Sequence, residues 1–310
     1  MNRETAENVI ILPRVSEAIR TYKPIVALES AVITHGLPQP VNFDTALEME
    51  RLIQENGAVP ATIAMLDGKI HIGLNEDELE RLAFLSNTRK ISRRDFGYAI
   101  TKKLSGGTTV AGTMTAAHLA GIRVFATGGI GGVHRDAPFD ISADLPELGR
   151  TPMIVVCAGV KAILDLPATI EVLETYGVLI SGYQTAEFPA FYSRASGLTL
   201  DSWMDSPEEI AAAATSQWNL GISSAILVVQ PPPAENEIPA NEIEGAINNA
   251  VAEAKAGGIH GPAVTPFLLE KVKTLTKGRS MATNIELLKN NARLASLIAY
   301  ALKPAVGKLI

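Results

Sequence analysis

The chain has 310 residues, of which 47% are hydrophobic and 19% charged, and its formal net charge is −6. This composition excludes a disordered chain, and the absence of a basic block argues against a general nucleic-acid binder. A single cysteine, Cys157, excludes a disulfide pair and a CxxC metal or redox motif and fits a reducing cytoplasm. No apolar stretch approaches membrane-spanning length, so we expect no membrane partner.

Short apolar runs alternate with helical patterns along the whole chain. In chain order they predict strands at 24–28, 61–66, 69–72, 123–127, 154–157, 178–180 and 225–229, and helices at 41–56, 75–85, 92–104, 207–219, 240–255, 264–275 and 280–302. Asp67-Gly68 is typical of a tight hairpin turn, which makes the sheet mixed. We therefore predict a single α/β domain over residues 1–310, with a central mixed sheet flanked by helices on both faces. Residues 1–8 read as a flexible polar tail.

Two glycine-rich segments, 105–113 and 128–132, lie near the centre of the sequence. Residues 129–134 lack the third glycine of a dinucleotide GxGxxG pattern, and residues 107–112 lack the lysine of a P-loop. Neither NAD nor ATP is indicated. The segments are either sharp bends or places where the backbone contacts an anion or a sugar phosphate.

Glu29 follows the first predicted strand and opens a polar cluster that includes Ser30, Thr34 and His35. Ligands of α/β proteins bind at the carboxyl ends of parallel strands. A carboxyl at that edge is either a general acid or base, or a helix cap or salt-bridge partner.

Short oxygen-bearing side chains alternate at Asp140, Ser142 and Asp144. This spacing predicts either ligands for a hard cation such as Mg²⁺ or Mn²⁺, or a local turn that caps the next helix. The two readings stay open.

Lys161 is the most informative residue, because it follows the apolar run 153–160 at the end of a predicted buried strand. Burial disfavours the charged ammonium and makes the neutral, nucleophilic amine accessible near pH 7. Such a lysine can form a Schiff base with a sugar or keto carbon. The alternative is a lysine whose stem packs on apolar surface while its amine reaches water or Asp165.

Taken together, these motifs resemble one family, the pseudouridine-5′-phosphate glycosidases, also called the indigoidine-synthase-A-like family. The most distinctive matches are ALESAVITHG at 27–36, ATGGIGGVHR at 126–135, FDISADL at 139–145 and CAGVKAILD at 157–165. Further matching segments are 56–64, 90–95, 182–185, 265–269, 284–285 and 290–292. The resemblance covers about residues 20 to 300.

The resemblance implies reversible cleavage of the C–C glycosidic bond of pseudouridine 5′-phosphate to uracil and ribose 5-phosphate. It implies that Lys161 forms a Schiff base with the ring-opened ribose and that Glu29 donates and accepts the protons. It also implies one Mn²⁺ per subunit, held by Asp140 and mainly by waters, and a cytoplasmic homotrimer. The implied substrate contacts are Lys90, Val110, Ser142, Ala143 and Asp144, with Thr127, His134 and Asn284 as further candidates.

Two other functions remain compatible with these residues. A Schiff-base aldolase that acts on a sugar phosphate uses a similarly placed lysine and a similar phosphate site. A non-catalytic sugar-phosphate-binding protein is the second alternative. The presence of Glu29, Asp140 and Lys161 together favours an enzyme over a binding protein.

Overall fold

The structure is a computed structural model that describes residues 7–135, 137–259 and 264–302. The predicted flexible tail falls on residues 1–6, which lie outside the described residues, and on residues 7 and 8, which are helical. Within the described ranges, no helix is both long enough and apolar enough to cross a membrane.

The main sheet is mixed, as predicted, and its central strands are parallel. The strands β3 (Val59–Leu66), β2 (Ile25–Leu28), β7 (Val124–Ala126), β10 (Ile154–Cys157), β14 (Ile226–Val229), β12 (Leu179–Tyr183) and β13 (Trp203–Met204) follow one another in this order and direction. Next to β3, β4 (Lys69–Ile72) runs antiparallel, and β1 (Val9–Ile11) pairs with β4.

The turn between β3 and β4 is the predicted Asp-Gly hairpin. Asp67 and Gly68 have φ angles of 49° and 77°. Positive φ at both central residues is the property of the type I′ turn that matches the twist of paired strands. The hairpin is what reverses the chain at this side of the sheet.

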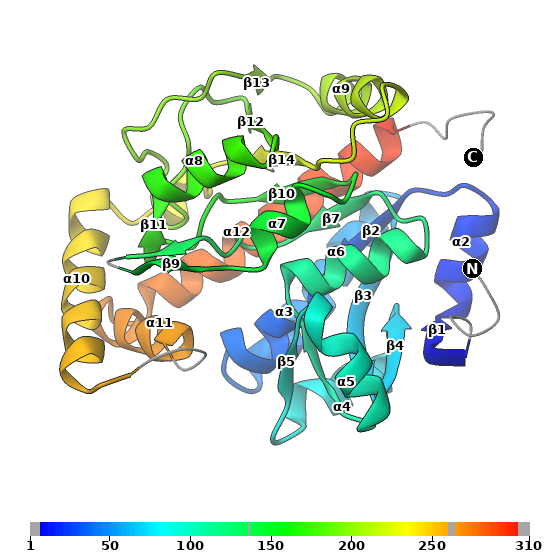
Figure 1. The fold of residues 1–310 in the computed structure, drawn as a ribbon, viewed down its shortest axis with the longest axis horizontal. Helices are drawn as coiled ribbons and strands as arrows, with labels where there is room; N and C mark the ends of the chain where they lie inside the picture. Colours follow the sequence, from blue (N-terminus) through cyan, green and yellow to red (C-terminus); the bar gives the residue numbers. More distant parts are fainter. Residues whose placement is uncertain (1–6, 136, 260–263, 303–310) are drawn as a thin grey trace.

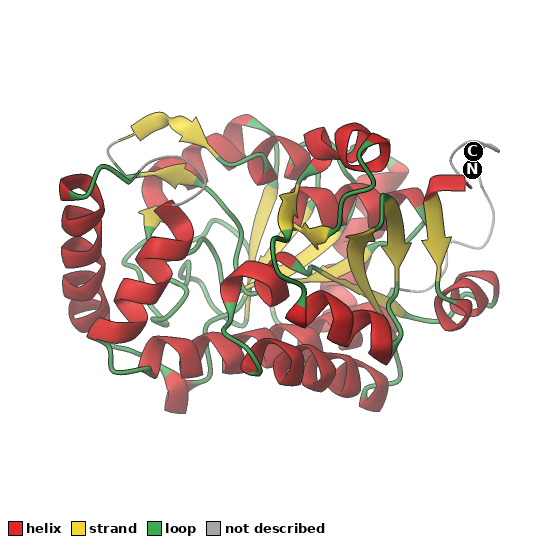
Figure 2. Cartoon of the chain, turned by 90° about the horizontal axis from the view of Figure 1, so that it is seen from below, coloured by secondary structure: helices red, strands yellow, loops and turns green. Residues whose placement is uncertain are grey.

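Helices cover both faces of the sheet (Figures 1 and 2). On one face, α12 (Arg279–Ala301) contacts β2, β7 and β10 and packs against α3 (Val41–Glu55) and α9 (Pro207–Asn219). On the other, α6 (Val110–Leu119) contacts β2 and β3 and packs against α7 (Asp144–Leu148). Every residue of β7, β10 and β14 is therefore buried. The remaining helices are α2 (Pro13–Arg20), α4 (Glu76–Phe84), α5 (Phe96–Thr101), α8 (Leu166–Thr175), α10 (Ala240–Ala256) and α11 (Val264–Leu275).

A small antiparallel sheet lies beside the main one and carries two of the predicted site segments. It consists of β11 (Leu164–Asp165), β8 (Val133–His134) and β9 (Ala137–Ile141). The helices α10 and α11 pack against each other at the same end of the molecule (Figure 1). The segment after Lys161 thus returns from the main sheet to pair with the segment after the glycine-rich loop.

The structure differs from the sequence prediction around residues 92–113. The predicted helix 92–104 is a short 3₁₀ turn followed by α5, and the first glycine segment contains β6 (Gly106–Thr108), which pairs with β3 and with β5 (Arg89–Ile91). A Cβ on Gly107 would lie 2.5 Å from the carbonyl oxygen of Ser30. Glycine is present because two backbones approach closely, a requirement that strand propensity does not reveal.

Candidate active site

The carboxyl ends of β2 and β7 lie side by side at one edge of the main sheet. Leu28 pairs with Ala126, so the next residues along the chain, Glu29 and Thr127, are neighbours. The Thr127 hydroxyl donates a hydrogen bond to a carboxylate oxygen of Glu29, and both side chains are buried. This edge is where parallel α/β sheets place their ligands, as the sequence predicts for Glu29.

The environment of Glu29 favours its protonated form. Burial raises the pKa of the carboxyl, although the positive charge of Lys161 and the hydrogen bond from Thr127 act in the opposite direction. The residue is 7% exposed. A carboxyl that keeps its proton to higher pH is suited to general acid catalysis, and the direction of the shift is the one expected for a proton donor.

Lys161 lies four residues beyond the end of β10, in a loop that runs beside the second glycine segment. Its backbone N–H donates to the carbonyl of Ile130 at 3.1 Å, and the N–H of Ile130 donates to the carbonyl of Gly159 at 3.0 Å. Gly159 has a φ of 90°, and a Cβ there would lie 2.5 Å from the carbonyl oxygen of Pro189. Lys161 is half-buried, less than the sequence predicts, because the chain leaves the sheet before reaching it.

One cavity is lined by four of the predicted site residues, namely Glu29, Lys90, Lys161 and Asn284. Burial lowers the pKa of the Lys90 amine, and the positive charge of Lys161 lowers it further, whereas Glu29 and Asp144 act in the opposite direction. The two lysines therefore share one electrostatic environment with a buried carboxyl. A cavity of this kind suits an anionic sugar phosphate that must also exchange protons.

Asp144 does not line this cavity, but its charge acts on Glu29 and Lys90, and its carboxylate joins two backbone segments. Its Oδ1 accepts a hydrogen bond from the N–H of Ala111, and its Oδ2 accepts one from the N–H of Gly131, both at 2.9 Å. The Ser142 hydroxyl accepts from the N–H of Asp144 at 3.2 Å and forms a local turn, but the N-cap residue of α7, Ala143, makes no side-chain cap hydrogen bond. A Cβ on Gly131 would lie 2.2 Å from the Ser142 oxygen, so the loops approach closely only because residue 131 is glycine.

Three other residues that the sequence predicts as substrate contacts lie close along the chain to Asp144 or to the segments that it joins. Val110 is buried as the first residue of α6, Ala143 is exposed just before α7, and His134 is half-buried in β8. Among the described residues, none of these three side chains lines the cavity that contains Glu29. His134 pairs with Leu164, three residues beyond Lys161. Their substrate roles stay predictions.

The predicted metal ligand, Asp140, lies in β9 with an exposed side chain. No group of three His, Cys, Asp or Glu side chains that could hold a metal ion occurs in the described part of the chain. A hard cation that retains most of its waters needs no such group, because one carboxylate can anchor it. The exposed Asp140 carboxylate fits this water-rich coordination, whereas the carboxylate of Asp144 is already engaged by two backbone N–H groups.

The sequence matches the model of one family, described as indigoidine synthase A like protein, over residues 14–301. The chain belongs to this family. Curated members are similar along their whole length: a pseudouridine-5′-phosphate glycosidase of Herpetosiphon aurantiacus is 51% identical over 96% of this chain and 99% of its own. Another, of Caldanaerobacter subterraneus, is 53% identical over 93% of this chain and 94% of its own.

Solved structures of the family have the same fold. The prealnumycin C-glycosynthase AlnA, in complex with ribulose 5-phosphate, has a TM-score of 0.88 and is 37% identical over 95% of this chain and 97% of its own. An indigoidine synthase A-like protein of Thermotoga maritima also has a TM-score of 0.88, at 35% identity over 96% and 98% of the two chains. These similarities confirm the predicted family and the predicted fold class.

His35 also lines the cavity that contains Glu29 and Lys161, although we assigned it no role from the sequence. Its Nε2 lies 3.1 Å from the carbonyl oxygen of Thr88, so Nε2 carries a proton, and its Nδ1 lies 2.6 Å from the Thr34 hydroxyl. Burial lowers the pKa of the imidazole, and the positive charge of Lys90 lowers it further. Both ring nitrogens of His35 thus have a hydrogen-bond partner, and its place in the polar cluster after Glu29 and in the matching segment 27–36 was the sequence signal for it.

Phe191 and Leu269 also line the cavity and were missed by the sequence reasoning. Phe191 has a φ of 62°, an uncommon conformation for a bulky residue, and its N–H donates to the carbonyl of Ala158 at 3.1 Å. Leu269 comes from α11, far along the chain. Phe191 lies in no matching segment, and Leu269 lies in the matching segment 265–269 but received no role, because an apolar side chain in a cavity looks like any core residue in the sequence.

Proposed function

We propose that this chain is a pseudouridine-5′-phosphate glycosidase that reversibly cleaves the C–C glycosidic bond of its substrate to uracil and ribose 5-phosphate. The observation that carries the proposal is the convergence of Glu29, Lys90 and Lys161 on one cavity at the carboxyl edge of the sheet. The full-length similarity to relatives named for this activity supports it.

A carbon-linked uracil is a poor leaving group, so the reaction needs an electron sink at C1′ of the ribose. In the proposed mechanism Glu29 protonates the ring oxygen as its bond to C1′ breaks, and the side-chain nitrogen of Lys161 bonds to C1′. The nitrogen then gives up a proton to the Glu29 carboxylate, and its lone pair forms the C1′=N bond of the iminium as the C–C bond breaks. The electron pair of the C–C bond stays on the uracil carbon, which takes up this proton from Glu29. Water hydrolyses the iminium, which releases ribose 5-phosphate, restores Lys161 and returns a proton to Glu29.

The remaining groups bind and orient the substrate in this proposal. Lys90 is the phosphate partner, and the Asn284 amide, which can both donate and accept, reads the uracil edge. Thr127 orients Glu29 through its hydrogen bond. Ser142 and Asp144 hold the glycine loop beside the cavity. Val110, Ala143 and His134 are proposed as further substrate contacts outside the cavity lining. Asp140 would hold a Mn²⁺ or another hard divalent cation, one per subunit, which supplies positive charge for the phosphate.

Purified protein incubated with pseudouridine 5′-phosphate and Mn²⁺ tests the proposal. We expect free uracil in the absorbance record and ribose 5-phosphate in equal amount. Borohydride added to protein with ribose 5-phosphate should leave a covalent adduct that peptide mapping assigns to Lys161, and Lys161→Ala should not be labelled. An adduct on another lysine would remove Lys161 from its role.

The two alternative functions give different results in the same experiment. An aldolase would cleave aldol sugar phosphates and release no uracil. A sugar-phosphate-binding protein would bind the ligand without turnover. The complex of a structural relative with ribulose 5-phosphate fits all three functions at the level of the sugar phosphate, so product analysis is the deciding measurement.

We also propose that the enzyme is a cytoplasmic homotrimer. Phe139 and Ile141 in β9 are 97% and 41% exposed, which supports an interface on this strand. The single cysteine, Cys157, is buried and free, in keeping with a reducing compartment. Light scattering of purified protein should give three times the mass of the chain, and Phe139→Asp should lower that mass.

A further inference from the structure

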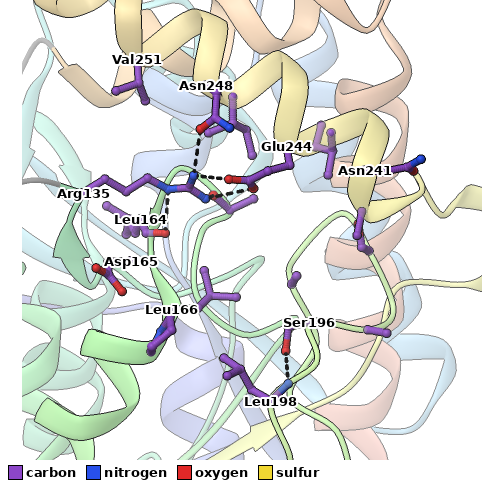
Figure 3. Close-up of a pocket in the computed structure, with 18 residues that line it drawn as sticks. Arg135, Leu164, Asp165, Leu166, Ser196, Leu198, Asn241, Glu244, Asn248 and Val251 are labelled. Carbon is purple, nitrogen blue, oxygen red and sulfur yellow. Dashed lines mark hydrogen bonds and ion pairs between the residues drawn. The ribbon is translucent and has the colours of Figure 1, made fainter.

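A large cavity lies beside the segment that follows Lys161, between this segment and α10. Its volume is about 750 Å³. Its lining includes Ala162 and Leu164 on one side and Glu244 and Asn248 of α10 on the other (Figure 3). The Arg135 side chain extends across it from the small sheet to α10 and joins the two sides.

Each of the three nitrogens of the Arg135 guanidinium donates at least one hydrogen bond. Its Nη2 donates to the carbonyl of Ala162 at 2.9 Å and its Nε to the carbonyl of Leu164 at 3.2 Å. Toward α10, Nη1 and Nη2 bind the two carboxylate oxygens of Glu244 at 2.5 and 3.2 Å, and Nη1 contacts the Asn248 oxygen at 3.4 Å. A planar guanidinium can make all of these bonds at once, which an ammonium cannot.

The two carbonyls that Arg135 binds belong to the residues one and three positions beyond Lys161. The N–H of Leu164 also donates back to the carbonyl of Lys161 at 2.9 Å, which closes a turn. We infer that Arg135 is a positioning residue for Lys161: it fixes the turn that sets the direction of the lysine side chain, and Glu244 of α10 holds the guanidinium in place. This inference rests on the proposed imine chemistry of Lys161.

The first test compares Arg135→Ala with Arg279→Ala as a matched control. Arg279, the first residue of α12, forms an ion pair with Glu242, which lies on α10 as Glu244 does. Removing Arg279 therefore also weakens the attachment of α10, but it leaves the turn after Lys161 unchanged. A displacement of about 1 Å at a reacting group costs about 100-fold in rate. We therefore expect Arg135→Ala to lower kcat and the rate of borohydride-trapped imine formation by about this factor, with KM for the substrate nearly unchanged. Arg279→Ala should keep both rates.

The cavity beside Arg135 permits a second, more specific test. In Arg135→Ala, millimolar guanidinium ion should enter the vacated space, bind the free carbonyls and Glu244, and restore much of the imine rate. Urea is planar and similar in size but uncharged, so it should restore little. Rescue should be absent in Lys161→Ala. Equal effects of guanidinium and urea, or none from either, would contradict a positioning role for the guanidinium.

Two conservative variants decide the question if Arg135→Ala does not fold. Arg135→Lys keeps the charge but cannot bind both carbonyls and Glu244, and Glu244→Gln weakens the support of the guanidinium. Both should slow imine formation, the first more than the second. Wild-type imine rates in both variants would overturn the inference. Absence of any trapped Lys161 adduct in the wild-type protein would instead overturn the proposed function.

Discussion

Glu29 and Glu147 are two buried glutamates whose surroundings give them opposite properties. Glu147 has no exposed surface, yet its pKa is lowered: burial acts to raise it, but the Thr151 hydrogen bond and the Arg150 guanidinium together outweigh burial. Glu29 is 7% exposed, and burial raises its pKa against the attraction of Lys161. The carboxyl with no exposed surface is thus the more acidic one.

The number and strength of hydrogen bonds to each carboxylate explain the difference. Glu147 binds the guanidinium groups of Arg93 at 3.0 Å and Arg150 at 2.6 Å, and it accepts from the hydroxyls of Thr115 at 3.0 Å and Thr151 at 2.7 Å. Among the described residues, Glu29 accepts one side-chain hydrogen bond, from Thr127. A fully bonded carboxylate holds elements together, whereas a sparsely bonded one in a cavity is free to exchange a proton with a ligand.

The largest effect should come from Glu29→Gln, which removes the exchangeable proton. We expect cleavage of pseudouridine 5′-phosphate to fall about 10²–10⁴-fold, the scale of general acid–base catalysis. Trapping of ribose 5-phosphate on Lys161 should partly persist, because the free sugar already samples an open aldehyde. Uracil release and adduct formation measure the two steps. Normal turnover in Glu29→Gln would mean that the raised pKa has no catalytic use.

Asp140 is an exposed carboxylate, unlike the buried Glu29 and Glu147. If it anchors a weakly held cation, chelation should remove most activity, and added Mn²⁺ or Mg²⁺ should restore it without refolding. Asp140→Ala should lose metal binding, measured by calorimetry, and melt near the wild-type temperature. Full activity after verified metal removal, or a collapse of thermal stability in the variant, would give Asp140 a structural role in β9 instead.

Glu147→Gln should affect stability rather than chemistry. Losing the charge of a carboxylate that binds two arginines and two hydroxyls should lower the free energy of unfolding by about 2 kcal/mol, the scale of a hydrogen bond to a charged group. Denaturant unfolding measures it. Arg150→Gln is the control: the arginine is half exposed, so its loss should cost less than about 1 kcal/mol. A stable Glu147→Gln protein with impaired turnover would reverse the roles given to the two glutamates.

The smallest effect is a difference in pH dependence. Because the pKa of Glu29 is raised above its ordinary 4.5 in the folded state, this residue favours the unfolded state at neutral pH, and Glu29→Gln should then be slightly more stable than wild type. That advantage should fade on acidification, before the pH reaches 4.5. The pKa of Glu147 lies below 4.5, so the deficit of Glu147→Gln should persist at that pH and fade only below it. The free energy of unfolding of both variants and the wild type, measured across this pH range, checks both expectations. If the two stability differences disappear over the same pH range, the pKa directions given to Glu29 and Glu147 are wrong.

The sequence by itself determined the family, the alternation of strands and helices, and the residues whose side chains can take part in the chemistry. Apolar runs of strand length predicted β2, β7, β10 and β14, and Asp67-Gly68 predicted the β3–β4 hairpin, because these depend on local hydrophobicity and turn geometry. The motif around Glu29 and Lys161 predicted two cavity residues for the same reason: their chemistry is carried by the residue type and its neighbours.

Only the tertiary structure decided which of these residues meet. The register of β2 against β7 brings Thr127 within hydrogen-bond distance of Glu29. Glycine is required at Gly107 in β6 and at Gly131 because other segments approach these two residues closely. Leu269 reaches the cavity from a helix more than 200 residues away from Glu29 along the chain. Contacts between distant segments depend on the packing of the whole sheet and its helices, which no local pattern records.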